Sequence, residues 1–146
     1  MLDKIIRQTI KFLLTGSKEL VLHHSFPHLD NIKTDEIGIY LHIPFCKSPC
    51  MYCPYFKEKY DEKKTLPYKE AVTHEINFYK PLLHGKTVTS FYIGGGTPTT
   101  MIGNGLEDLI KSIRSSFHLK CSVSTETHPN DIKPSVIDTL KKIGVE

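Results

Sequence analysis

Residues 37–53 read IGIYLHIPFCKSPCMYC, a stretch with an alternating apolar pattern, a proline and three closely spaced cysteines. Isoleucine or leucine occupies every second position of 37–43, with glycine, tyrosine and histidine between them. Because successive side chains of a β-strand point to opposite faces, this pattern predicts a strand over 37–43 that ends before Pro44. The cysteine loop therefore begins at the carboxyl end of a strand.

Two more strand–helix pairs are expected after the cysteine loop. Strands are predicted over 88–93 and 121–127, and helices are predicted to begin near Pro67, after Asn104 as an N-cap, and near Pro134. Pro81 and Gly144 are expected at the ends of the first and third helices, and 145–146 are expected to begin another strand. Because strands alternate with helices, the sequence predicts parallel strands in an α/β fold.

Three unusual features follow the three predicted strands. The cysteine loop follows the first strand, the run Gly94-Gly95-Gly96-Thr97-Pro98 follows the second, and Glu126 ends the third. Proteins of the α/β class place their sites at the carboxyl ends of parallel strands. We therefore expect the three features to form one composite site at one edge of the sheet.

Cys46, Cys50 and Cys53 have the spacing C-x3-C-x2-C, which suits zinc or an iron–sulfur cluster. Structural zinc takes four protein ligands, and His42 could supply the fourth. A histidine that hydrogen-bonds nearby backbone is the simpler interpretation of His42. A [4Fe–4S] cluster held by three cysteines leaves one iron open to a cofactor or substrate. The spacing of the cysteines alone does not distinguish zinc from an iron–sulfur cluster.

The glycine run and Glu126 are candidates for contact with a small polar ligand. Glycines let a ligand approach the backbone, and this run lacks the spacing of a Rossmann or phosphate-binding loop. The alternation of the third strand turns Ser122, Ser124 and Glu126 to one face, which favours Glu126 as a hydrogen-bond acceptor. Cys121 is interpreted as a small buried apolar residue.

Composition argues against several classes of function. The chain has 146 residues, 39% of them hydrophobic and 24% charged, and its formal charge of +3 is too small to indicate a nucleic-acid partner. No apolar run is long enough to predict a membrane span. Clustered thiols favour a metal centre in a reducing compartment, so we expect a cytoplasmic location.

The N-terminal region is expected to precede the core domain. Residues 5–14 are largely apolar but contain Arg7 and Lys11, which favours an amphipathic helix over a secretory leader. We therefore expect a helix and an irregular lead-in over 1–35, and the core domain over 36–146.

Taken together, the motifs resemble a known family. Residues 40–53 read YLHIPFCKSPCMYC, and GGGTP at 94–98 and Glu126 followed by Pro129 come after them in order. This combination resembles radical S-adenosylmethionine (SAM) enzymes, in the branch that includes oxygen-independent coproporphyrinogen III oxidases, haem chaperones and haem-utilisation methyltransferases. The resemblance covers 37–146 and implies the N-terminal part of a partial TIM-like (β/α) barrel, with about three β/α units.

The resemblance implies a role for each matching residue. Cys46, Cys50 and Cys53 would bind a [4Fe–4S] cluster whose remaining iron takes SAM. The residues that would contact SAM are Tyr40, Tyr52, Gly95, Gly96, Thr97 and Glu126. The implied chemistry is that of an oxidoreductase: reductive cleavage of SAM to methionine and a 5′-deoxyadenosyl radical, which abstracts hydrogen from a substrate.

The resemblance also implies partners. A porphyrin-like substrate and a one-electron reductant such as flavodoxin or ferredoxin are expected. Pro54-Tyr55 stands where the coproporphyrinogen oxidases carry a Gly-Cys pair, which weakens that particular assignment. A haem chaperone, a Cys3His zinc module and an inactive fragment are therefore alternatives. Because family members are longer, we expect the chain to be truncated, without the C-terminal half of the core domain.

Overall fold

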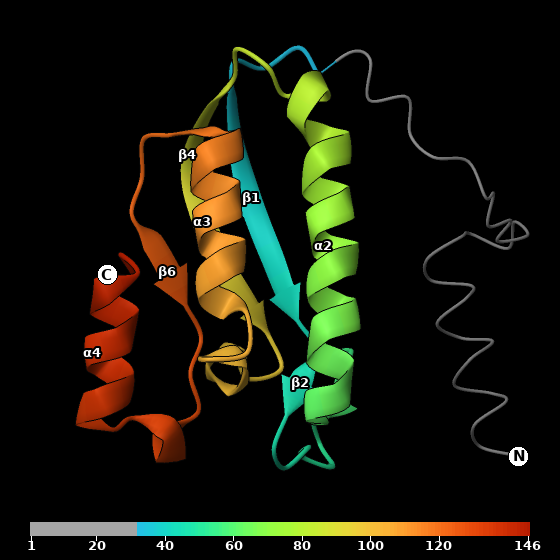
Figure 1. Ribbon diagram of the computed structural model, residues 1–146, viewed down its shortest axis with the longest axis vertical. Helices are drawn as coiled ribbons and strands as arrows, with labels where there is room; N and C mark the ends of the chain where they lie inside the picture. Colours follow the sequence, from blue (N-terminus) through green and yellow to red (C-terminus); the bar gives the residue numbers. More distant parts are fainter. Residues whose placement is uncertain (1–31) are drawn as a thin grey trace, which may run out of the picture. The chain divides into compact units, whose positions relative to one another are not determined.

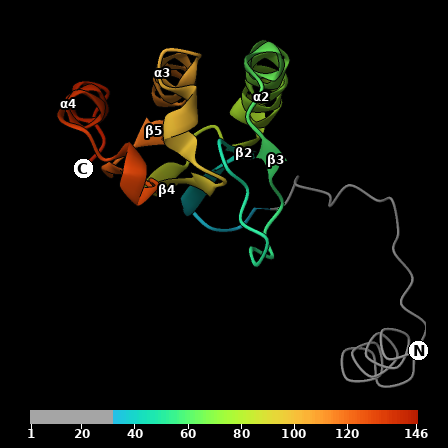
Figure 2. The same ribbon diagram turned by 90° about the horizontal axis from the view of Figure 1, so that it is seen from below.

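The computed structural model describes residues 32–146, so the helix expected within 1–35 lies outside the described residues. The main sheet contains β1 (Glu36–Ile43), β4 (Thr87–Gly95), β5 (His118–Leu119) and β6 (Val123–Thr125); Figure 1 labels β1, β4 and β6, and Figure 2 labels β5. All its pairings are parallel, with β1 on one side of β4, and β5 and then β6 along the other side. The predicted α/β fold with parallel strands is confirmed.

Three helices follow the strands along the chain: α2 (Glu62–Leu82), α3 (Leu106–Ser116) and α4 (Pro134–Lys142). Figure 2 shows all three on the same side of the sheet. Right-handed connections between parallel strands give this arrangement, which is that of consecutive units of a (β/α) barrel. Within residues 32–146, no helix covers the opposite face of the sheet.

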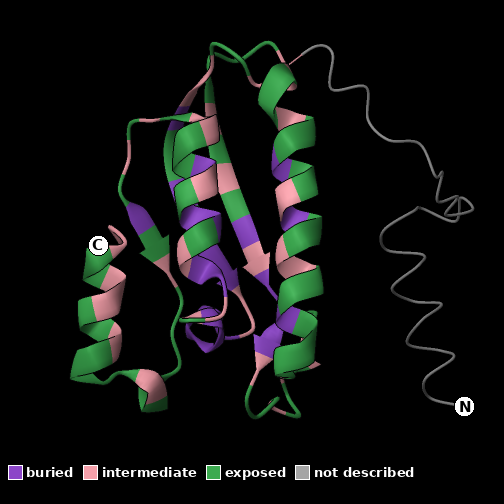
Figure 3. Ribbon diagram, in the orientation of Figure 1, coloured by how far each residue is buried: buried purple, intermediate pink, exposed green. Residues whose placement is uncertain are grey.

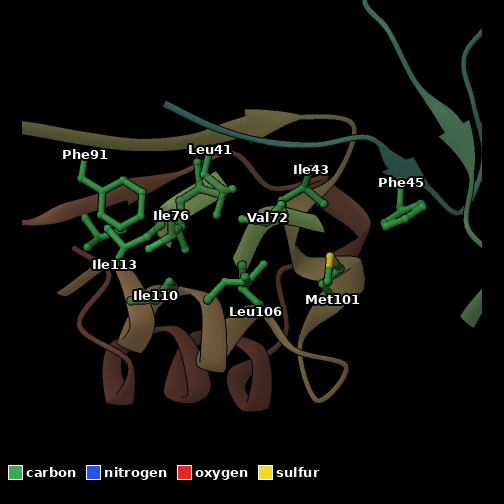
Figure 4. Packing of buried hydrophobic residues seen from close by; sticks show 13 residues of the cluster. Leu41, Ile43, Phe45, Val72, Ile76, Phe91, Met101, Leu106, Ile110 and Ile113 are labelled. Atoms are coloured by element: carbon green, nitrogen blue, oxygen red, sulfur yellow. The ribbon is translucent and has the colours of Figure 1, made fainter. Parts of the chain in front are cut away.

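The hydrophobic core lies between the sheet and the helices, and buried residues line the inner sides of both layers (Figure 3). Strand and helix side chains interdigitate there (Figure 4), because apolar residues recur every second position in β1 and at helical spacing in α2 and α3. The buried members are Leu41, Ile43, Phe45, Val72, Ile76, Phe91, Ile93, Met101, Leu106, Leu109, Ile110, Ile113 and Val123.

The third strand is interrupted, so the prediction of one strand over 121–127 is only partly correct. β5 ends at Leu119, which lies opposite Val88 of β4, and β6 begins at Val123, which lies opposite Phe91. Four positions along this segment therefore span only three positions of β4. β4 also shifts register against β1 in this region. This irregularity separates β5 from β6, and Cys121 lies in the gap, half-buried against the core as a small apolar residue would be.

The predicted start of α2 is wrong, and the helix ends at Leu82, one residue beyond the predicted Pro81. Asp61 is the N-cap, because its carboxylate accepts a hydrogen bond from the Lys63 N–H at 3.0 Å, and the helix therefore starts at Glu62. Pro67 and Pro81 both lie inside the helix. Each proline removes one helical hydrogen bond, and burial of the apolar stripe of α2 outweighs that loss.

The predicted N-cap of α3 is also wrong by one residue. Gly105 occupies that position with a φ of 115°, a conformation that glycine adopts without strain. The Asn104 amide instead donates a hydrogen bond to the Tyr60 hydroxyl at 2.9 Å. A contact distant in the sequence therefore takes the Asn104 side chain away from the helix end.

The end of α4 matches the prediction. Gly144 has a φ of 79°, and the Val145 N–H donates to the Leu140 carbonyl at 3.0 Å, as in a Schellman motif. Val145 then forms a parallel bridge with Val123, and the Glu146 N–H donates to the Val123 carbonyl at 2.9 Å. Residues 145–146 thus pair alongside β6, as predicted for the beginning of another strand.

Truncation of a core leucine should destabilise the fold far more than truncation of an exposed one. Leu109 is 0% exposed, so Leu109→Ala should lower the free energy of unfolding by about 2–5 kcal/mol through lost burial and a residual cavity. Leu66 is 56% exposed, so Leu66→Ala should change it by less than about 0.5 kcal/mol. Urea unfolding followed by circular dichroism measures both, and equal losses would contradict the assigned core.

Candidate functional site

The carboxyl ends of β1 and β4 are joined by backbone hydrogen bonds. Ile43 at the end of β1 lies opposite Gly95 at the end of β4. The contact continues beyond the strands, because the Gly96 N–H donates to the Ile43 carbonyl at 2.7 Å and the Thr97 N–H donates to the Phe45 carbonyl at 2.8 Å. The cysteine loop and the glycine run therefore start from one fixed junction, as the sequence predicts.

Gly95 and Gly96 permit this close approach. A Cβ on Gly96 would lie 2.7 Å from the Phe45 carbonyl oxygen and 2.9 Å from Cys46 Sγ. Gly95 has a φ of 110°, and its Cβ would lie 2.7 Å from a carbonyl oxygen of β1. The Thr97 hydroxyl lies 3.8 Å from Cys46 Sγ, within reach of a weak hydrogen bond to sulfur. The glycine run is thus packed directly against the first cysteine.

Gly94 leaves room for Tyr40 and Glu126 to meet. A Cβ on Gly94 would lie 2.9 Å from the Tyr40 hydroxyl oxygen and 3.0 Å from Glu126 Oε1. The Glu126 N–H donates to the Ile93 carbonyl at 2.9 Å, which fixes the start of its loop against β4. The Tyr92 hydroxyl donates to Glu126 Oε1 at 3.1 Å, and its ring stacks on Tyr40 with centroids 6.1 Å apart.

Tyr92 is a site residue that the sequence analysis missed. The signal was present, because the alternation of β4 places Tyr92 on the same face as Gly94. Loss of hydration and the Glu126 charge raise the pKa of Tyr40, and loss of hydration and the hydrogen bond to Glu126 raise the pKa of Tyr92. Both phenols are therefore protonated at neutral pH, beside a carboxylate that can accept hydrogen bonds from a ligand.

A short strand pair closes the base of the cysteine loop. β2 (Phe45–Cys46) pairs in parallel with β3 (Glu58–Lys59), and the Tyr60 N–H donates to the Cys46 carbonyl at 2.8 Å. Between these anchors, residues 47–57 form neither helix nor strand. Cys46 is consequently the one loop cysteine that is held by regular backbone pairing.

Cys50 and Cys53 lie in the irregular part of the loop. The Cys53 N–H donates to the Cys50 carbonyl at 3.3 Å. In the part of the chain that the structure describes, no three His, Cys, Asp or Glu side chains are gathered closely enough to hold a metal ion. Tyr52 is 89% exposed, and a hydrogen bond with Cys50 raises its pKa. The structure thus joins Cys46 to the glycine run without gathering the three cysteines.

The chemistry of the loop nevertheless fits an iron–sulfur cluster. All four cysteines of the chain are free thiols and partly exposed, so none is committed to a disulfide or sealed in the core. Thiolates are the ligands that such clusters take from proteins. Gly96 brings the backbone of the glycine run against Cys46 Sγ, so a ligand on this sulfur would lie next to that backbone.

His42 hydrogen-bonds within the site rather than with the cysteines. Its Nε2 lies 3.1 Å from the Phe56 carbonyl oxygen and its Nδ1 lies 3.2 Å from the Tyr40 hydroxyl. Because a carbonyl oxygen only accepts, Nε2 carries the hydrogen and Nδ1 accepts from Tyr40. The interpretation of His42 as a histidine that binds nearby backbone is confirmed, and both ring nitrogens are already used.

Asp131 is a second residue that the sequence analysis missed. Its carboxylate contacts the Lys47 ammonium at 3.0 Å and accepts a hydrogen bond from the Thr99 hydroxyl at 3.2 Å. Burial alone would raise the pKa of Asp131, but the hydrogen bond and charge of Lys47 lower it, so the carboxyl is ionised at neutral pH. Lys47 and Asp131 are 84 positions apart, and no local pattern predicts such a pair.

The chain was compared by sequence with protein-family models and with curated proteins. No protein-family model matches the chain. The oxygen-independent coproporphyrinogen III oxidase of Escherichia coli K12 is 32% identical over 111 residues, which cover 74% of this chain and 24% of the relative. Heme chaperone HemW of Mycobacterium tuberculosis H37Rv is 31% identical over 123 residues, covering 81% and 32%. Anaerobilin synthase of Escherichia coli O157:H7 is 30% identical over 110 residues, covering 73% and 25%.

A solved structure gives the same result for the fold. The coproporphyrinogen III oxidase HemN of Escherichia coli, described as a radical SAM enzyme, superimposes with a TM-score of 0.69 and 32% sequence identity, over 75% of this chain and 26% of that chain. Parallel strands, a cysteine loop and a glycine run at one edge of the sheet, together with these relatives, define the class as radical SAM.

The chain belongs to the oxygen-independent coproporphyrinogen III oxidase-like family of radical SAM proteins. Its fold is that of the N-terminal part of the TIM-like barrel of this family, with three β/α units, as predicted. The chain spans about a quarter to a third of the length of the relatives it matches. Among the described residues, we find no helix with the length and apolar character of a membrane span.

The packing of Gly96 against the cysteine loop predicts a sharp contrast between two glycines. Gly96→Ala should lower the free energy of unfolding by about 1–3 kcal/mol, because its Cβ would overlap the Phe45 carbonyl and the Cys46 sulfur. Gly38→Ala is the matched control, since the nearest atom would lie at 3.8 Å and its backbone needs no positive φ. Thermal and urea unfolding compare the variants, and equal stability would contradict the close approach.

Proposed function

We propose that the chain carries the cluster-binding and cofactor-binding part of a radical SAM oxidoreductase. In this proposal, Cys46, Cys50 and Cys53 bind a [4Fe–4S] cluster, and residues 36–146 are the core domain. The contact of the glycine run with Cys46 carries the proposal, because it brings a backbone suited to a polar ligand to the first thiol. Membership of the family supports the same cofactors.

The residues proposed to hold SAM divide by chemistry. Gly95, Gly96 and Thr97 offer backbone polar groups and one hydroxyl to the methionine part of SAM. Tyr40 on β1 and Glu126 directly after β6 offer a phenol and a carboxylate, and Tyr52 offers an aromatic ring from the cysteine loop. Together, the bound cluster and SAM supply reductive cleavage of the sulfonium, giving methionine and a 5′-deoxyadenosyl radical. The protein positions the two groups.

The proposed setting follows from that chemistry. Cleavage of SAM consumes one electron, so we propose a one-electron reductant such as flavodoxin or ferredoxin as a partner. Free, partly exposed thiols suit a reducing compartment, which supports a cytoplasmic location. Relatives named for coproporphyrinogen III and for anaerobilin support a porphyrin-like substrate.

A haem chaperone is the second candidate. It is supported by the match to heme chaperone HemW, which covers 81% of this chain. Pro54-Tyr55 also replaces the Gly-Cys pair that the resemblance leads us to expect of an oxidase. Haem titration and an assay for coproporphyrinogen decarboxylation separate the two: haem binding without decarboxylation favours the chaperone. The Cys3His zinc module is less favoured, because both nitrogens of His42 are hydrogen-bonded.

Iron and sulfide loading under anaerobic conditions tests the cluster. We expect each wild-type chain to bind about four irons and to gain the broad visible absorbance of a [4Fe–4S] protein. Cys46→Ala, Cys50→Ala and Cys53→Ala should each lose most of the iron, because each removes one thiolate ligand. Cys121→Ala is the matched control and should load normally, since Cys121 lies between β5 and β6. Stoichiometric zinc in place of iron would contradict the cluster.

Cleavage of SAM by the loaded, dithionite-reduced chain tests the function. We expect 5′-deoxyadenosine and methionine in equal amounts, measured by chromatography. Glu126→Gln should weaken SAM binding about tenfold, because it removes a charged hydrogen-bond acceptor. Glu70→Gln, an exposed change on α2, should leave binding unchanged. A loaded chain that neither binds nor cleaves SAM would contradict the proposal.

A further inference from the structure

Asp131 connects three segments that approach the site from different parts of the chain. Its Oδ1 lies 3.0 Å from Lys47 Nζ, and Lys47 directly follows Cys46 in the cysteine loop. Its Oδ2 accepts from the Thr99 hydroxyl at 3.2 Å, and Thr99 lies in the short helix Pro98–Met101 that follows the glycine run. One carboxylate therefore links the cysteine loop, the glycine run and the loop after β6.

The carboxylate is held in place by its own loop. Asp131 ends the short helix Pro129–Asp131, and its N–H donates to the His128 carbonyl at 2.8 Å. The His128 ring accepts from the Asn130 N–H at 3.2 Å, so this histidine caps the turn. The Asp131 side chain is only 15% exposed, and Thr99 is 7% exposed. The contact is therefore preorganised on the Asp131 side.

A second ion pair in the same protein offers a useful contrast. Lys69 Nζ contacts Asp108 Oδ2 at 2.9 Å and joins α2 to α3, and the Asp108 side chain is 67% exposed. Exposed pairs of this kind contribute little to stability. The pair of Lys47 with Asp131 differs in place rather than in strength, because it lies one residue from a proposed cluster ligand and shares its carboxylate with Thr99.

We propose that Asp131 is a positioning residue that holds the start of the cysteine loop against the glycine run through Lys47 and Thr99. This inference rests on the proposed function and deepens it: backbone hydrogen bonds hold Cys46 beside the glycine run, and the contact at Lys47 restrains the irregular loop that follows this first cluster ligand. Since residues 47–57 carry no helix or strand, the side-chain contact at Lys47 supplies a restraint that regular backbone pairing does not.

SAM affinity of the cluster-loaded chain tests the inference. Lys47→Met and Asp131→Asn should each raise the dissociation constant for SAM about fivefold, and the double variant should be no worse than either alone, because both remove the same contact. Lys47→Arg keeps the positive charge and should therefore bind SAM with the affinity of the wild type. Lys69→Met and Asp108→Asn, which break the other pair, should bind SAM as the wild type does. Iron content should be equal in all variants.

Affinities of the Lys47 and Asp131 variants within twofold of the wild type would overturn the inference. So would equal losses in the Lys69 and Asp108 variants, since the effect would then follow from any lost ion pair. Hydrogen exchange on the chain without iron adds a readout that needs no cofactor. The backbone amides of residues 47–57 and 97–101 should exchange faster in Lys47→Met and in Asp131→Asn. Unchanged exchange would contradict a restraint from this contact.

The two proposals fail in different ways. If the wild-type chain loads no cluster or binds no SAM, the proposed function is overturned, and with it the role of Asp131 in SAM binding. Faster exchange of 47–57 in the two variants would still support the contact itself. If the wild type binds SAM and the variants match it, the proposed function stands and the inference about Asp131 is overturned.

Discussion

Eight residues of β1 pair in parallel with β4, and the backbone hydrogen bonds continue past the ends of both strands into the cysteine loop and the glycine run. This shared register is the constraint on which the site depends. It places Gly96 so close to Cys46 that a side chain on Gly96 would overlap the sulfur. The core beneath, between the sheet and three helices, holds both strands in this register.

The same alternation that builds the core leaves polar groups on the opposite face. In β1 and β4, leucine and isoleucine point toward the helices, so Tyr40 and Tyr92 lie together on the other side. Glu126 completes this group from the end of β6, and loss of hydration together with the interaction with Glu126 raises the pKa of both phenols. Hydrogen-bond donors and an acceptor therefore lie together beside the cysteine loop, at positions set by the alternation of the strands.

Much of this was predictable because it depends on local pattern. Alternation predicted β1, and the order of strands and helices predicted that the cysteine loop, the glycine run and Glu126 would meet. Features set by distant contacts were not predictable: Asn104 leaves the end of α3 to bind Tyr60, and Asp131 meets Lys47 across most of the chain. The start of α2 was predictable in principle, since Asp61 is a good N-cap, but Pro67 was the stronger signal.

The central claim is that the cysteine loop and the glycine run bring a cluster and SAM into direct contact. Electron paramagnetic resonance of the reduced, loaded chain with SAM carrying ¹⁵N in its amino group measures that contact. If SAM binds the open iron through its amino group, the labelled cofactor would give a ¹⁵N hyperfine coupling that is absent with unlabelled SAM. A loaded cluster whose spectrum does not change when labelled SAM is added would contradict the claim.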